Sequence, residues 1–154
     1  PQVVCQGRSL SLEGVIDGNI LNFLAQESLL NTGIIQAQEK LKFCSSHKVE
    51  NTGQLYSPFV SVFGDSFTNT GDIGGSKILL KTLSFFLNQG SIEGQTHLVL
   101  ISSGLFQNDH LINFSGGKSH FIFTGKADNA GVMTGRDAEV FFRGELSQTH
   151  RGHR

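Results

Sequence analysis

The sequence predicts an all-β fold, a parallel β-helix of about seven coils with 18 to 21 residues in each coil. Three observations lead there: a composition that disfavours helices, a motif that returns at a nearly constant interval, and alternating apolar residues between the motifs. The 154 residues include 19 Gly and only 2 Pro, and Asn, Ser and Thr recur throughout. These types disfavour helix interiors. The 13 Phe residues supply apolar surface for a folded core.

The charge of the chain and the length of its apolar segments argue against two classes of partner. Its 12 Lys and Arg residues nearly balance 13 Asp and Glu residues, for a net charge of −1. Nucleic-acid-binding proteins show a basic excess or stripe, whereas the cations here are scattered until a short basic tail at 150–154. No segment approaches the roughly 20 apolar residues of a bilayer-spanning helix. We expect no nucleic-acid partner and no membrane insertion.

An Asn-x-Gly motif recurs through most of the chain. It occupies Asn31-Thr32-Gly33, Asn51-Thr52-Gly53, Asn69-Thr70-Gly71, Asn88-Gln89-Gly90 and Asn129-Ala130-Gly131, with the degenerate Asn108-Asp109-His110 between the last two. Successive Asn residues are separated by 20, 18, 19, 20 and 21 positions. The same interval reaches back to Gly14 and forward to Gly152, so the repeat covers nearly the entire chain. A fixed period of this length is typical of repeat architectures.

The residues after each motif repeat as well. Two positions after the Gly lies an apolar residue: Ile16, Ile35, Leu55, Ile73, Ile92, Ile112 or Met133. Four positions after it the residue is small, as Gly18, Ala37, Ser57, Gly75, Gly94 and Gly135, with Phe114 as the exception. An alternating apolar pair then follows: Leu41/Phe43, Val60/Val62, Ile78/Leu80, Leu98/Leu100, Phe121/Phe123 and Val140/Phe142. Such alternation predicts short β-strands.

Strands this short cannot bury an apolar face alone, so the units must stack. In a parallel β-helix, equivalent residues lie about 4.8 Å apart and inward side chains form columns, including stacked Phe rings. We expect a hydrogen-bonded ladder of Asn31, Asn51, Asn69, Asn88, Asn108 and Asn129. We expect corner glycines, in backbone conformations closed to other residues, at Gly14, Gly33, Gly53, Gly71, Gly90 and Gly131.

Other folds share some of these features. A β-sandwich or up-and-down barrel also has short strands, but its turns fall every 8 to 12 residues without one shared template. A leucine-rich repeat has a similar period but needs a Leu-x-x-Leu-x-Leu signature, which does not occur at a fixed offset here.

The period also places Cys5 and Cys44 in one column, two coils apart with Ala25 between them. Since two coils are about 9.6 Å, we expect both to be free, buried thiols.

The segment from Asn31 to Phe43 resembles the N-x-G-x-I-x-A-x-x-x-L-x-L unit of filamentous-haemagglutinin-type repeats. These repeats occur in large secreted exoproteins of Gram-negative bacteria, including adhesins and the sticks of contact-dependent inhibition toxins. The resemblance covers roughly residues 12 to 152. It implies a right-handed parallel β-helix, two-partner secretion to the bacterial cell surface, and neighbouring β-helix coils of a parent protein as partners. Residues 108–120 depart from the pattern, and we expect an irregular coil there.

Parallel β-helices also carry polysaccharide lyases and hydrolases, whose chemistry needs clustered carboxylates. Here Asp17 is followed on later coils by Gln36, Tyr56, Gly74, Glu93, Asn113 and Thr134, so no carboxylates stack in that column. The other acids fall at differing offsets, and the six His residues are dispersed. Only His110 and His120 could approach each other, around the irregular coil. We expect no catalytic residues, no cofactor and no metal site.

These observations favour one non-enzymatic β-helical segment spanning residues 1–154. We interpret it as a structural stalk or adhesive shaft of a secreted surface protein, extending and displaying a binding or toxin domain. A host-cell glycan or surface receptor is an expected partner for its outer faces. One alternative is a β-helical polysaccharide lyase or hydrolase. A further alternative is a self-stacking filament module, because both ends finish at whole coils without an evident cap.

Overall fold

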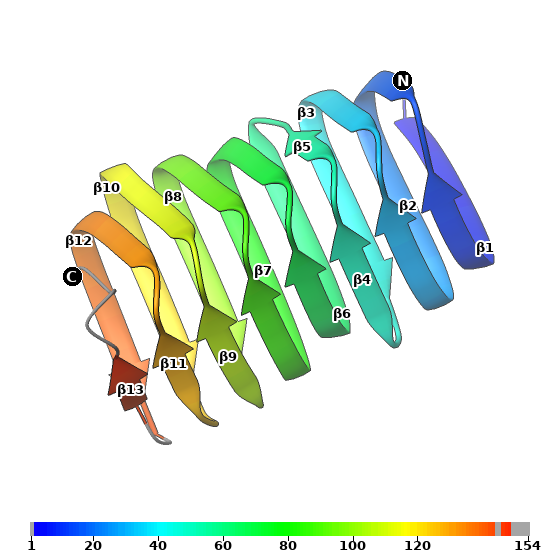
Figure 1. Cartoon of the computed structure of the whole chain (residues 1–154). Coiled ribbons are helices and arrows are strands. Elements are labelled where there is room, and N and C mark those ends of the chain that lie inside the picture. The colour runs from blue at the N-terminus through cyan, green and yellow to red at the C-terminus, as the bar shows by residue number, and fades with distance from the viewer. Residues whose placement is uncertain (1, 144–145, 149–154) are drawn as a thin grey trace.

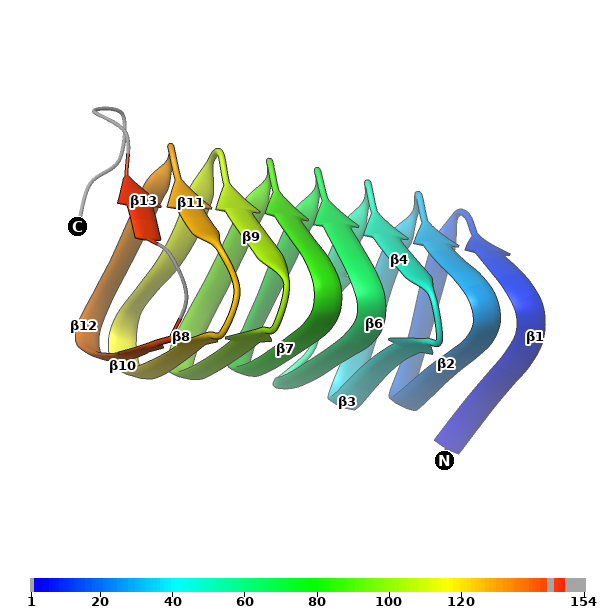
Figure 2. The same ribbon diagram turned by 90° about the horizontal axis from the view of Figure 1, so that it is seen from below.

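The structure, a computed structural model, describes residues 2–143 and 146–148. The chain winds into a β-solenoid of about seven turns, with successive coils side by side from β1 at one end to β12 at the other (Figure 1). Every strand pairing among these residues is parallel, and Figure 2 shows the right-handed winding of the coils. The predicted parallel β-helix is confirmed. Gly152 and the basic tail at 150–154 lie outside the described residues.

The strands follow one another without an intervening helix in the described part of the chain. They are β1 (Gln2–Leu12), β2 (Val15–Asn31), β3 (Ile34–Ser45), β4 (Lys48–Asn51), β5 (Gln54–Tyr56), β6 (Phe59–Asn69), β7 (Asp72–Asn88), β8 (Ser91–Ser102), β9 (Leu105–Asn108), β10 (Leu111–Phe123), β11 (Ala127–Asn129), β12 (Val132–Phe142) and β13 (Leu146–Gln148).

Each coil has three faces, which we define on residues 34–51. The first face is 34–37, the second is 40–45 and the third is 48–51, and each pairs with the same face of the next coil. The longest strands, β2 and β7, bend at the corners and run through all three faces. The Asn-x-Gly motif forms the corner between the third face and the first face of the next coil. The period of the sequence is therefore one full turn of the solenoid.

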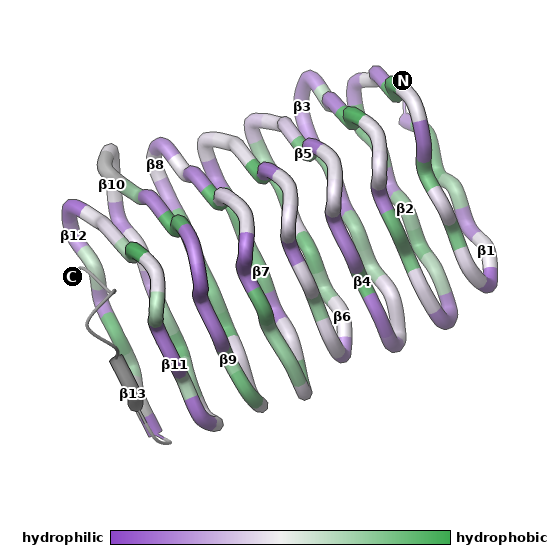
Figure 3. The backbone as a smooth tube through the Cα atoms, in the orientation of Figure 1, coloured by the Kyte–Doolittle hydropathy of each residue, from purple (hydrophilic) through white to green (hydrophobic). Residues whose placement is uncertain are grey.

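The core consists of columns of apolar side chains that run along the axis. Figure 3 shows hydrophobic positions that recur along the backbone from coil to coil. On the first face the predicted column is continuous in register, and its five central residues are at most 1% exposed: Ile35, Leu55, Ile73, Ile92 and Ile112. On the third face the rings of Phe67 and Phe86 lie 5.5 Å apart, and those of Phe86 and Phe106 lie 5.1 Å apart. Such spacings are favourable for aromatic pairs and add to the burial of apolar area.

The second face corrects one assignment of the repeat. Leu98 pairs with Ser119, whereas Phe121 pairs with Leu100 and Phe123 with Ser102. The apolar pairs of the last two coils, Phe121/Phe123 and Val140/Phe142, are thus displaced by two residues along the face. Ser119, which is 0% exposed, fills the place where an apolar residue was expected. The displacement follows a register shift between Asn113 and Lys118, at the beginning of this face.

Phe114 lies inside that register shift. It stands in the column of small residues, points into the core and is 0% exposed. A Cβ added to Gly94, one coil earlier, would overlap the Phe114 ring. The ring therefore uses the space that Gly94 leaves, and Gly135 follows it on the next coil. The predicted irregular segment at 108–120 thus contains a large inward side chain that fills the space beside Gly94.

The two cysteines are free, as predicted, but their placement differs from the prediction. Cys5 pairs with Phe23, whereas Cys44 pairs with Leu24, so they occupy adjacent columns rather than one. Both are half-buried and not fully buried. The error is one residue, because the register between β1 and β2 shifts between Gly7 and Ser9, where a bulge interrupts the uniform count.

Candidate functional site

The six motif asparagines form one column at the corner between the third and first faces, which we call the asparagine column. The side-chain Nδ2 of each donates to Oδ1 of the next, over 2.8 Å for Asn31 to Asn51, 2.9 Å for Asn51 to Asn69, 2.9 Å for Asn69 to Asn88, 2.8 Å for Asn88 to Asn108 and 2.8 Å for Asn108 to Asn129. Leu12 precedes this column and Gln148 follows it. The hydrogen bonds all run in one direction along the axis.

Four of these asparagine amides also donate to the carbonyl oxygen of the glycine at their own corner: Asn31, Asn51, Asn69 and Asn88. Asn88 Nδ2 lies 3.0 Å from the carbonyl oxygen of Gly90 and 3.0 Å from that of Leu111 on the next coil. Its Oδ1 accepts from the Gly90 N–H over 3.3 Å. Asn88 is 0% exposed, so these contacts replace water completely. A buried amide that keeps its hydrogen bonds is stabilising, whereas one that loses them is costly.

The corner glycines act by close approach rather than by unusual backbone angles. Among the described residues only Gly14 has a positive φ, of 74°. The expectation of special conformations at the later corners is therefore wrong. At Gly33, Gly53, Gly71 and Gly90, an added Cβ would overlap the backbone of the preceding corner. Glycine is needed there because successive corners touch, and the same holds for Gly131 above His110.

The degenerate corner at His110 shows what happens without glycine. The N–H of Leu111 binds the Gly90 carbonyl over 3.2 Å, whereas the equivalent bond from Gln54 to Gly33 is 2.9 Å. His110 Nδ1 lies 3.1 Å from the same Gly90 carbonyl oxygen. The imidazole therefore adds a contact where the backbone bond is longer. The ladder continues through this coil, since Asn108 keeps both of its asparagine partners.

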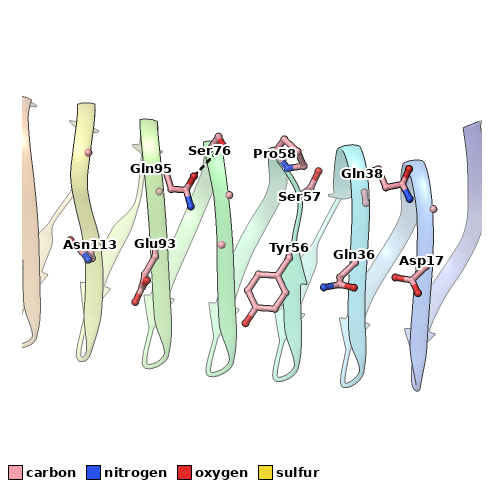
Figure 4. Close-up of a pocket in the computed structure, with 16 residues that line it drawn as sticks. Asp17, Gln36, Gln38, Tyr56, Ser57, Pro58, Ser76, Glu93, Gln95 and Asn113 are labelled. Atoms are coloured by element: carbon pink, nitrogen blue, oxygen red, sulfur yellow. Dashed lines mark hydrogen bonds between the residues drawn. The ribbon is translucent and has the colours of Figure 1, made fainter.

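A second corner, between the first and second faces, carries an open groove of about 920 Å³ on the outside of the solenoid. Figure 4 shows two rows of side chains along it: one with Asp17, Gln36, Tyr56, Glu93 and Asn113, the other with Gln38, Pro58, Ser76 and Gln95. The column of small residues lies between the rows. We call this feature the outer groove. Its first row is the column that begins with Asp17, in which the sequence shows no stacked carboxylates.

Tyr56 is the single aromatic residue lining the outer groove. Its ring lies against Gly74 on the next coil, where an added Cβ would be 2.9 Å from the ring atom Cδ1 and 3.1 Å from Cε1. Burial raises the pKa of the Tyr56 hydroxyl above its usual value, and the charges of Asp72 and Glu93 raise it further. These three residues also line one hollow of about 260 Å³. Two acids at different offsets on adjacent coils thus line one hollow, which a search of the sequence column by column missed.

The described residues contain no group of three or more His, Cys, Asp and Glu side chains arranged to hold a metal ion. His120 lies beside His97, with ring centroids 5.4 Å apart, and its Nδ1 is 3.1 Å from a carboxylate oxygen of Glu139. His110 instead contacts the corner backbone. No helix in this part of the chain could span a membrane.

Comparison with protein-family models, with curated proteins and with solved structures found no match for this chain. The β-solenoid of about seven turns is compatible with a β-helical repeat region.

Proposed function

We propose that this chain is a stiff shaft segment of a secreted surface exoprotein. The observation that carries the proposal is the asparagine column, five buried amide hydrogen bonds in series along the axis. The column links successive coils at one corner, and the parallel backbone ladders link them on all three faces. A solenoid built this way gains length by adding coils and has its outer faces available for contact.

The repeat supports a narrower version of the proposal. The Asn-x-Gly unit resembles filamentous-haemagglutinin-type repeats, so we place the shaft in an exoprotein of that type, exported by two-partner secretion to a bacterial surface. There it would hold a binding or toxin domain away from the cell and contact further β-helix coils of its parent. The outer faces would meet a host-cell glycan or receptor. We propose no enzymatic activity, nucleic-acid partner or membrane insertion for the segment.

A distance measurement tests the shaft directly. Gln6 and Phe141 are exposed and lie in one column seven coil intervals apart, so their separation is about 34 Å. Spin labels on Gln6→Cys and Phe141→Cys, in a background with Cys5 and Cys44 changed to Ser, report this distance by electron paramagnetic resonance. We expect one narrow distribution. A broad or multiple distribution contradicts a stiff shaft.

One observation favours a second candidate, a glycan-cleaving enzyme. Asp72 and Glu93 share a hollow with the Tyr56 hydroxyl, and paired carboxylates are the usual groups for glycoside hydrolysis. Incubation with a panel of neutral and acidic glycans, with and without calcium, tests it. If the wild-type chain depolymerises a glycan and the Glu93→Gln variant does not, the chain is an enzyme. The proposal that its whole function is that of a shaft would then be overturned. Intact glycans after incubation support the shaft.

A further inference from the structure

The outer groove presents polar groups that the protein itself does not use. Among the described residues, the side chains of Gln36, Gln38, Tyr56 and Glu93 make no hydrogen bond to another protein group. Gln36, Gln38 and Glu93 are exposed, and Tyr56 is half-buried. In contrast, the amides of the asparagine column are fully occupied by their neighbours. The groove thus offers donors and acceptors at the spacing of the coils, about 4.8 Å.

The charge of the groove restricts its ligand. No Lys, Arg or His lines it, and its two carboxylates, Asp17 and Glu93, stand four coil intervals apart. A sulfated or uronic-acid chain would meet uncompensated negative charge. A strongly cationic chain would find carboxylates at two places only, Asp17 at one and Glu93 with Asp72 at the other, with neutral amides and hydroxyls between them. The complementary ligand is therefore uncharged and rich in hydroxyl groups.

Tyr56 supplies the apolar part of the site. Because Gly74 has no side chain, the Tyr56 ring has room to lie against the next coil. The ring offers a flat apolar face with a hydroxyl at its edge, which suits the apolar face of a pyranose ring. The carboxylates of Asp72 and Glu93 beside it accept hydrogen bonds from hydroxyl donors. Small-molecule sites combine apolar surface and a few polar groups in the same way.

We propose that the outer groove binds a neutral polysaccharide chain lengthwise along the solenoid axis, with a sugar ring packed on Tyr56. The first row, from Asp17 to Asn113, spans five coil intervals or about 24 Å, so the site takes several sugar units. The inference deepens the adhesive-shaft proposal by naming the ligand class and the face that binds it. The spin-label distance, measured without ligand, tests the shaft separately.

The binding test uses the whole chain and defined probes. Calorimetry with neutral oligosaccharides of two to eight units, from cellulose, xylan, mannan and amylose, is compared with heparin, polygalacturonate and oligolysine of similar length. We expect one neutral series to bind, with affinity rising with length until the groove is filled. Tyr56→Ala weakens that binding about tenfold, which corresponds to about 1.4 kcal/mol. Tyr56→Phe keeps the ring face and loses much less.

The control is Phe141→Ala, which removes an exposed aromatic residue from another face and is expected to leave the affinity unchanged. The denaturant midpoint of each variant is measured as well, so that a loss of binding is read only from folded protein. The proposal is overturned if no neutral oligosaccharide binds, if heparin, polygalacturonate or oligolysine binds more tightly, or if folded Tyr56→Ala binds as well as the wild type.

Discussion

The two corners of the solenoid differ in how their residues vary from coil to coil. The asparagine column holds the same residue on six successive coils, and its central members are 0% exposed. The first row of the outer groove changes at every coil, from Asp17 through Gln36, Tyr56 and Gly74 to Glu93. Both columns repeat at the same spacing, because they are built on the same coils.

The difference shows where structure and recognition are separated in this molecule. A side chain whose partner is its own equivalent on the next coil must keep its type, because one change breaks two contacts. A side chain that faces solvent has no such constraint and is available for a ligand. The regular column therefore stabilises the solenoid, and the variable column carries any specificity.

The largest effect is expected at a corner glycine. Gly71→Ala places a Cβ against the backbone of the Thr52-Gly53 corner, so two coils must separate, at a cost of about 3 kcal/mol in the free energy of unfolding. Gly14→Ala is the matched control, since its Cβ meets open space and only its φ of 74° is strained. That should cost about 1 kcal/mol. Urea denaturation measures both, and equal costs would refute the close-approach account.

A smaller loss is expected within the ladder. Asn69→Ala removes the acceptor of Asn51 and the donor to Asn88, both at 2.9 Å, and should destabilise the fold by about 2 to 3 kcal/mol. Asn22→Ala serves as the control, because Asn22 is half-buried outside the column. We expect a change within about 0.5 kcal/mol for it. If the two variants unfold at the same urea concentration, the ladder is not a source of stability.

The groove row should tolerate the same kind of truncation. Gln36→Ala removes an exposed amide without a protein partner, so the free energy of unfolding should change by less than about 0.5 kcal/mol. The measurement is the same urea titration. A loss comparable to that of Asn69→Ala would remove the contrast between the two corners.

The smallest effect concerns the ionisation of Tyr56, the only tyrosine in the chain. Its raised pKa means that the folded state favours the neutral phenol. The resulting stability is fully present below a pH of about 10 and is lost as the pH rises through the folded pKa. Tyrosinate absorbance should show a higher midpoint in the folded chain than in urea. Glu93→Gln should lower the titration midpoint of Tyr56 in the folded chain only in part, because burial is the larger cause of the raised pKa. Equal midpoints in the folded chain and in urea would contradict the burial of Tyr56.

Much of this arrangement could be predicted from the sequence, because each coil repeats the same physical requirement. The intervals between Asn31, Asn51 and Asn69 were enough to place them in one column. Phe121 was misplaced because the register shifts between Asn113 and Lys118, which a uniform period does not reveal. The role of the later corner glycines was also missed, since contact between successive corners depends on the path of the backbone. The hollow at Tyr56 depends on diagonal neighbours, which a search by columns passes over.

Hydrogen exchange of side-chain carboxamides, followed by nuclear magnetic resonance, tests the central claim most directly. That claim is that the asparagine column is a continuous, water-free series of hydrogen bonds, whereas the groove amides face solvent. We expect the amide protons of Asn51, Asn69 and Asn88 to persist long after those of Gln36 and Gln38 have exchanged. Exchange of all five carboxamides at similar rates would contradict the claim, because it would mean that water reaches the column as readily as it reaches the groove.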